Sequence, residues 1–202
     1  KPDFRWNIRE LAKTSNVSVG LVARITGCLK KFGVIETGGL GRNGFILLKK
    51  PEQLLELWTN QYDFSLNRVK SFYSPDKNSL NKITAFFKKR SIKYALTLHS
   101  GANFITEYFS YPDVHIYTAA KLSQETMLNL SSLMEIKKLA SGGNIHIVEP
   151  YYRNAVFNRT QLIKNVSVVS KLQLYLDLCN FIPRGSEHAK ALYDVLKGEI
   201  YD

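Results

Sequence analysis

The sequence predicts an α+β fold in which an N-terminal winged helix-turn-helix is followed by a mixed α/β domain. Two short capped helices and a glycine-rich hairpin follow one another within residues 5–49. Positive charge is concentrated in residues 1–50, and strand-like and helix-like segments alternate after residue 73. We therefore divide the chain into a DNA-binding domain at 1–50, a connector helix and linker at 51–72, and an α/β domain at 73–202.

The composition is that of a globular chain with a sizeable core, since 45% of its 202 residues are hydrophobic. No segment approaches the roughly 18 consecutive apolar residues of a membrane span, and residues 1–5 lack the apolar region of a signal peptide. We therefore expect a cytoplasmic protein. Two distant cysteines and four scattered histidines predict neither a disulfide framework nor a zinc site, and no cofactor is expected (Cys28, Cys179, His99, His115, His146 and His188).

The net charge of +11 is distributed unevenly along the chain. Residues 1–50 hold 10 Lys or Arg and 3 Asp or Glu, whereas the remainder holds 18 and 14. Concentrated positive charge indicates a polyanionic partner at the N-terminal region. Charge alone is also compatible with a merely soluble basic protein. A DNA-binding motif in the sequence is needed to distinguish these two possibilities.

Residues 7–32 predict a helix-turn-helix. Asn7 can cap a helix over residues 8–13, residues 14–16 form the turn, and Asn16 tolerates the left-handed conformation. We expect Val17 to pack inward and Ser18 to cap a second, longer helix. Helical phase predicts that one side of this second helix faces the core, namely Val22, Ile25, Leu29 and Phe32.

The opposite side of the second helix presents Gly20, Arg24, Gly27 and Lys31. A glycine inside a helix costs about 1 kcal/mol relative to alanine, and close backbone approach to DNA is a reason to tolerate it; drift on a solvated face is the alternative. Arg24 is suited to a guanine edge. Ser18 and the amides beside it are suited to a phosphate, as are the side chains of Lys13 and Lys31.

A glycine-rich hairpin completes the motif. Gly33 ends the second helix, and strands at 34–36 and 44–48 flank a loop at 37–43. Arg42 and Asn43 lie at the tip of this predicted wing, where a cation gains from the phosphate potential. A winged helix also needs a helix before Asn7, so we expect the natural chain to extend upstream, or another segment or subunit to cover the apolar faces.

Residues 73–202 mix strand and helix patterns. Strands are predicted at 93–98, 114–118 and 144–149, and a helix begins at Ser123 and runs on through 128–139. Another helix covers 172–179, and Ser186 caps the last one. We expect Tyr175 to pack in the core and Asp177 to accept a hydrogen bond from a nearby loop that involves Arg184.

Motifs near both ends resemble one bacterial regulator family. Residues 6–12 (WNIRELA) and 17–22 (VSVGLV) are similar to its winged helix, and residues 173–178 (QLYLDL) with 184–189 (RGSEHA) are similar to its C-terminal segment. The family is the AbiEi-type antitoxins of type IV toxin–antitoxin systems. The resemblance implies a DNA-binding autorepressor with a role in viral defence, whose second domain counteracts a nucleotidyltransferase toxin.

Two enzymatic hypotheses compete with this regulator. A nucleotidyltransferase places a Gly-Ser-type turn before a pair of carboxylates, and the turn at 99–101 with Asp113 has this layout. His115 stands where the second carboxylate belongs, which disfavours Mg²⁺ and predicts at most a degenerate, silent site. A nuclease would need Glu135 and Lys137 on a strand beside Asp113, but their segment reads as helical. We therefore expect no catalytic and no metal site.

Overall fold

The computed structural model describes residues 4–39, 41–106, 112–139 and 142–201. The chain divides into two compact units. Unit 1 comprises Lys1–Gln61 together with Lys197–Asp202, and unit 2 comprises Tyr62–Leu196. The structure has eight α-helices among the described residues and two β-sheets, so it is mixed α and β as predicted.

Unit 1 begins with two capped helices. In α1 (Ile8–Ser15), the Asn7 side chain accepts a hydrogen bond from the amide of Arg9, and Glu10 accepts one from the amide of Asn7. Asn16 ends α1 with φ of 54° and ψ of 46°, the left-handed conformation expected for this turn. Ser18 then caps α2 (Val19–Lys31). These local predictions are confirmed because short-range capping groups determine where both helices begin.

A two-stranded hairpin and a third helix complete unit 1. Strands β1 (Ile35–Gly38) and β2 (Phe45–Leu48) are antiparallel, a short 3-10 helix (η1, Gly41–Asn43) lies between them, and α3 spans Pro51–Gln61. Their core holds three buried residues from the hairpin and its entry (Val34, Ile35 and Ile46). Side chains from the segment before α1, from α1, α2 and β2, and from α3 pack around it (Trp6, Ile8, Leu11, Leu29, Leu48, Leu54 and Leu57).

The buried side of α2 differs from the prediction. Ile25 and Phe32 are 47% and 56% exposed, and Val17 is exposed as well, so their assignment to the core was wrong. Val22 is buried as predicted, and Thr26 is buried in addition. Thr26 can occupy this position because its hydroxyl donates to the carbonyl of Val22 at 2.8 Å, which satisfies its polar group within the helix.

Unit 2 is built on a seven-stranded mixed sheet with the order β6-β3-β7-β5-β4-β9-β8. Strand β3 begins inside the segment expected as a linker, and the strands at 94, 114 and 145 match the predicted ones. The pairs β5–β7 and β4–β9 are parallel and the others antiparallel. The strands are β3 (Arg68–Tyr73), β4 (Tyr94–Leu96), β5 (Val114–Thr118), β6 (Lys137–Leu139), β7 (Ile145–Glu149), β8 (Gln161–Ile163) and β9 (Val166–Val168).

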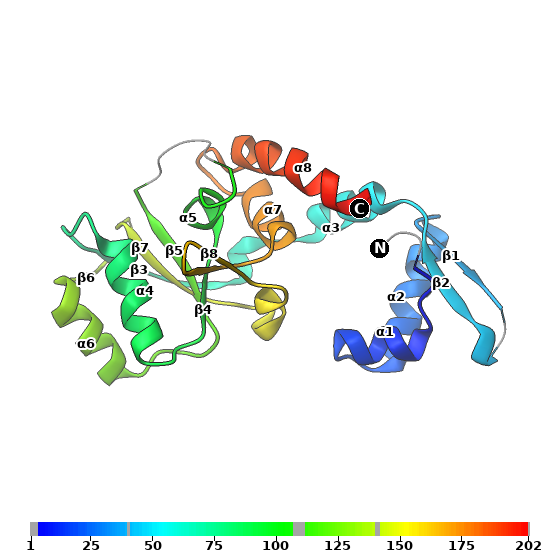
Figure 1. Cartoon of the computed structure of the whole chain (residues 1–202), viewed down its shortest axis with the longest axis horizontal. Helices are drawn as coiled ribbons and strands as arrows, with labels where there is room; N and C mark the ends of the chain where they lie inside the picture. The colour runs from blue at the N-terminus through cyan, green and yellow to red at the C-terminus, as the bar shows by residue number, and fades with distance from the viewer. Residues whose placement is uncertain (1–3, 40, 107–111, 140–141, 202) are drawn as a thin grey trace. The chain divides into compact units, whose positions relative to one another are not determined.

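Helices flank this sheet. Figure 1 draws α4 and α6 together on its lower side, whereas α5 and α7 lie toward its upper side. The helices are α4 (Ser79–Lys89), α5 (Leu98–Ala102), α6 (Gln124–Met134), α7 (Lys171–Cys179) and α8 (Gly185–Tyr201), with short 3-10 helices η2 (Phe64–Leu66) and η3 (Arg153–Phe157). Ser123 caps α6 as predicted. The last helix begins at Gly185, so Ser186 is not its cap.

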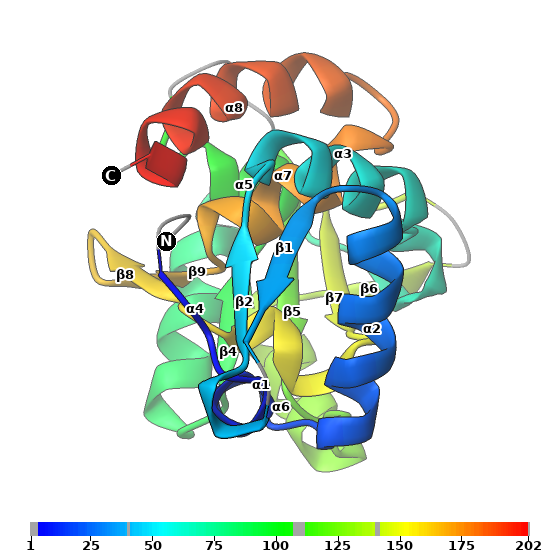
Figure 2. The ribbon, with the colours of Figure 1, turned by 90° about the vertical axis from the view of Figure 1, so that its right-hand side faces the viewer.

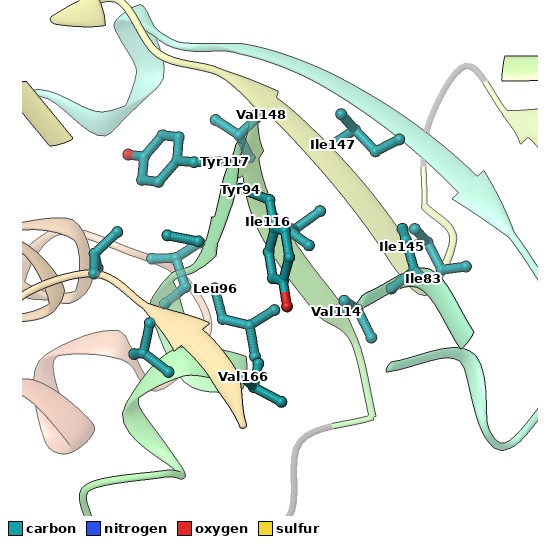
Figure 3. Packing of buried hydrophobic residues seen from close by; sticks show 14 of the residues in the cluster. Ile83, Tyr94, Leu96, Val114, Ile116, Tyr117, Ile145, Ile147, Val148 and Val166 are labelled. Atoms are coloured by element: carbon teal, nitrogen blue, oxygen red, sulfur yellow. The ribbon is translucent and has the colours of Figure 1, made fainter. Parts of the chain in front are cut away.

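The helix predicted through 139 is shorter in the structure. Glu135 adopts a left-handed conformation with φ of 52° and ends α6 at Met134, and residues 137–139 then form strand β6. The helical spacing of three or four residues continues past Glu135, so the sequence pattern wrongly predicted a helix through residue 139. Apolar side chains from the central strands of the sheet fill the core, as Figure 3 shows for Leu96, Ile116 and Ile147.

The turn before β7 requires glycine at residue 143. Gly143 has φ of 93°, and a β-carbon there would overlap the carbonyl oxygen of Phe72 on β3. We expect Gly143→Ala to lower the free energy of unfolding by about 2 kcal/mol or more, because it combines a strained φ with a backbone clash. Gly142→Ala is the matched control, since φ is also positive there but the β-carbon would meet nothing within 4 Å. Equal losses in denaturant titrations of the two variants would contradict the clash.

Candidate nucleic-acid interface and buried polar clusters

The face of α2 that points away from the core of unit 1 carries the predicted DNA-contacting residues. Gly20, Arg24, Gly27 and Lys31 are exposed, and their spacing of three or four residues places them on one face. Gly20 and Gly27 have nothing within 4 Å of the position that a β-carbon would occupy. Packing inside the unit therefore gives no reason for either glycine, and a partner can approach the α2 backbone closely at both positions.

The junction of α1 and α2 adds groups suited to an anion. Ser18 Oγ accepts a hydrogen bond from the amide of Leu21 at 3.2 Å, a bond that leaves the hydroxyl hydrogen for another acceptor. Lys13 lies exposed in the last turn of α1. The helix N-terminus also carries a partial positive charge from its backbone amides.

The hairpin beside α2 has a tip with a restricted backbone (Figure 2). Gly39 has φ of 70°, and a β-carbon there would overlap the carbonyl group of Asn43, so only glycine fits. Asn43 is exposed at the end of η1. The backbone of Arg42 belongs to η1, but its side chain lies outside the described residues.

The two described carboxylates that precede α3 are paired with groups outside α2. Within residues 4–50 they are Glu10 and Glu36. Glu10 accepts from the amide of Asn7, and Glu36 lies 3.6 Å from the ammonium of Lys49. The cationic side chains of α2 therefore have no carboxylate on their own helix, and the field at its exposed face is positive.

The interior of unit 2 holds a fully buried carboxylate, Asp177 on α7. The hydroxyl of Tyr62 donates to its Oδ1 at 2.5 Å and the amide of Gln173 at 2.8 Å. The hydroxyl of Thr97 donates to Oδ2, and that of Tyr117 to Oδ1 at 3.2 Å. Burial raises the pKa of Asp177 to about 6, although these donors act in the opposite direction.

The partners of Asp177 differ from the predicted loop contact. Among the described residues the donors to Asp177 are Tyr62, Thr97, Tyr117 and Gln173, whereas the Nε of Arg184 lies 3.0 Å from a carboxylate oxygen of Glu187. Tyr175 is partly buried against the core, as expected, and its ring lies 5.6 Å from that of Tyr193. Gln173 lies one helical turn before Asp177, but the other three donors come from sequence-distant segments, so spacing along the chain could not identify them.

Contrary to the prediction, the four histidines cluster in two adjacent pairs. One pair, His99 and His188, belongs to a hydrogen-bonded chain. His99 Nε2 lies 3.1 Å from the carbonyl of Pro183 and donates to it. His188 Nδ1 lies 3.0 Å from His99 Nδ1, and the hydroxyl of Thr106 lies 2.9 Å from His188 Nε2. Burial lowers the pKa of His188 to about 4.

The second pair stacks across the parallel strands β5 and β7. The rings of His115 and His146 are 4.3 Å apart, and Asp113 Oδ2 lies 3.7 Å from His146 Nε2. Burial and the neighbouring His146 and His99 hold the pKa of His115 well below its usual range. Phe181 packs edge-on against both His99 and His115, which joins the pairs into one cluster.

Comparison with models of protein families assigns the chain to one family. A family model described as "Transcriptional regulator, AbiEi antitoxin, Type IV TA system" matches residues 47–197, about three quarters of the chain. The chain belongs to the AbiEi antitoxin family. The resemblance read from the sequence is thereby confirmed, and the match includes α3 and all of unit 2 but excludes α1 and α2. Searches of curated proteins and of solved structures found no match.

The AbiEi family is one of regulators and antitoxins of type IV toxin–antitoxin systems rather than of enzymes. The nuclease motif is not assembled in this member. Lys137 does lie on a strand, so its helical assignment was wrong, but β3 and β7 separate that strand from β5, which follows Asp113. Three strand spacings amount to about 14 Å, too far for a shared site.

In this AbiEi member, the serine of the turn that resembles a nucleotidyltransferase turn makes structural hydrogen bonds. Ser100 Oγ donates to backbone carbonyls and accepts from the amide of His115 at 2.9 Å, so it ties α5 to β5. In the described ranges, no three His, Cys, Asp or Glu side chains are grouped so that they could hold a metal ion. No helix among the described residues is long and apolar enough to cross a membrane.

Proposed function

We propose that unit 1 of this AbiEi antitoxin binds double-stranded DNA as a winged helix, with α2 as the recognition helix and the β1–β2 hairpin as the wing. The observation that carries the proposal is the exposed face of α2. Arg24 and Lys31 lie there beside two glycines with open space at their β-carbon positions. This arrangement supports insertion of the helix into a major groove, where a close backbone approach increases contact.

Contacts divide by chemistry in this proposal. Arg24 reads a base edge, preferentially the two acceptors of a guanine. Ser18, Lys13 and Lys31 hold phosphates on either side, and the wing with Arg42 and Asn43 follows the backbone or the minor groove. Phosphate contacts give affinity and the base contact gives sequence preference.

The proposed biological role is autorepression. In the cytoplasm, where DNA binding would place it at the nucleoid, the protein would occupy the promoter of its own operon. Two bound copies would require inverted half-sites. The α/β domain at 73–202 would counteract a toxin, since the family description names an antitoxin of a type IV system, and the resemblance read from the sequence implies that this toxin is a nucleotidyltransferase. The α/β domain that contains Asp113 would then be a catalytically inactive relative of the nucleotidyltransferases.

Arg24→Ala tests the recognition role. We expect it to weaken binding to a promoter fragment by about tenfold and to relax the preference for that sequence, because a bidentate guanine contact contributes about 1–3 kcal/mol of discrimination. A gel-shift titration against promoter and scrambled duplexes measures both effects. Lys190→Ala, an exposed cation on α8 within unit 2, is the matched control and should bind as the wild type does. Unchanged affinity and preference in Arg24→Ala would disprove the assignment.

A further inference from the structure

Helix α6 forms an apolar ridge on the surface of unit 2. Leu128 is 68% exposed and Leu133 is 48% exposed. A groove runs along each side of this helix. Large exposed aliphatic side chains that border hollows commonly mark a site for another macromolecule.

The first groove lies between α6 and β3 and has a volume of about 710 Å³. Its apolar floor includes Phe72 and Met127, and Lys70 and Lys121 stand at its edge. The second groove lies between α6 and α4, which are neighbours in Figure 1, and has a volume of about 560 Å³. It is lined by Lys82, Ala85, Phe86, Lys89, Arg90, Asn129 and Leu133.

The edges of both grooves are positive. Their lining residues include five cations and no carboxylate. Glu149 partly neutralises Lys70 at 2.7 Å, and Asp76 pairs with Lys82. For Lys89, Arg90 and Lys121 the described part of the chain gives no ion pair. An apolar ridge with uncompensated cations at its sides is complementary to an acidic segment that carries apolar side chains.

We infer that α6 and its two grooves, the α6 ridge, form a docking site for an acidic amphipathic segment of a partner protein. Apolar side chains of the partner would enter the grooves beside Leu128 and Leu133, and its carboxylates would meet Lys89, Arg90 and Lys121. This inference goes beyond the DNA-binding proposal and does not depend on it, because the ridge belongs to unit 2.

The groove walls favour a polypeptide over a nucleic acid. Single-stranded nucleic acids are held largely by bases that stack on exposed aromatic faces. The two aromatic side chains that line the grooves do not offer such faces. Phe72 is buried, and the guanidinium of Arg90 lies 4.7 Å above the ring of Phe86. The remaining apolar lining is aliphatic, which suits leucine or isoleucine side chains of a protein partner.

A synthetic 18-residue helical peptide, with Leu at i, i+4, i+7 and i+11 and Glu on the flanking positions, is the probe. We expect the fluorescently labelled peptide to bind the full chain at micromolar concentrations in an anisotropy titration. Lys89→Glu combined with Arg90→Glu should weaken this binding at least tenfold, and Leu133→Ser at least fivefold. A peptide with Lys in place of Glu should not bind.

Two variants serve as matched controls. Leu162→Ser removes another leucine of unit 2, which is 72% exposed on β8, and Lys190→Glu reverses another exposed cation. Both should bind the peptide as the wild type does, and melting temperatures and promoter binding should stay unchanged in all variants. The inference is overturned if the acidic peptide does not bind at 1 mM, or if ridge and control variants bind it equally. It is also overturned if a 15-nucleotide RNA, and not the peptide, binds in a way that depends on Lys89 and Arg90.

Discussion

Asp177→Ala should lower the free energy of unfolding of unit 2 by about 3–5 kcal/mol. The substitution leaves three buried donors, from Tyr62, Thr97 and Tyr117, and the half-buried amide of Gln173 without their common acceptor. It also opens a void in a core where the side chain is fully buried. Denaturant titration followed by circular dichroism measures this loss.

A matched aspartate separates this effect from a general loss of charge. Asp194 is exposed on α8 within unit 2, so Asp194→Ala should change the free energy of unfolding by less than about 0.5 kcal/mol. Tyr62→Phe removes one donor only and should lie between the two variants. If Asp177→Ala were as stable as Asp194→Ala, the hydrogen-bond network would not organise unit 2.

Acidification from pH 6.5 to 4.5 should lower the free energy of unfolding by several kcal/mol, about 2 of them from His188 alone. Burial lowers the pKa of all four histidines in the folded chain, that of His188 to about 4. In the unfolded chain they titrate near the ordinary value of about 6.5. The unfolded chain therefore binds more protons below that pH, and stability falls as the pH drops toward 4.

Asp177 acts in the opposite direction, since its pKa is raised to about 6 and its protonation favours the folded chain below that pH. The histidines outweigh one carboxylate because four of them are held neutral. His188→Gln should reduce the slope of stability against pH by up to one proton near pH 5.5, measured by denaturant titrations at a series of pH values. Lys190→Gln should leave the slope unchanged. A wild-type stability that is flat between pH 6.5 and 4.5 would contradict the neutral histidine cluster.

The sequence predicted those elements whose signals are local. Asn7, Ser18 and Ser123 cap helices within a few residues of their own position, and Gly33 marks the end of α2 with φ of 66°. Each signal depends on the backbone next to it, so one sequence was sufficient to find it. The alternation of polar and apolar residues likewise located the central strands of unit 2.

Features that depend on distant residues were missed or misassigned. His99 and His188 are 89 residues apart, and Tyr62 and Asp177 are 115 apart, yet each pair is hydrogen-bonded. Their contact follows from the order of strands in the sheet, which periodicity does not specify. Ile25 shows the related limit on α2, because helical phase gives the apolar side of a helix but not which part of it a neighbour covers. The DNA-contacting residues stay a prediction.

We propose that this AbiEi family member regulates transcription by binding DNA through α2 and the hairpin. Genome-wide mapping of bound sites, in cells that produce either the wild type or Arg24→Ala, tests this proposal. We expect the wild type to be enriched at its own promoter and Arg24→Ala to lose this enrichment while the protein remains at wild-type abundance. Absence of enrichment anywhere for the wild type, or the same peaks for the variant, would contradict it.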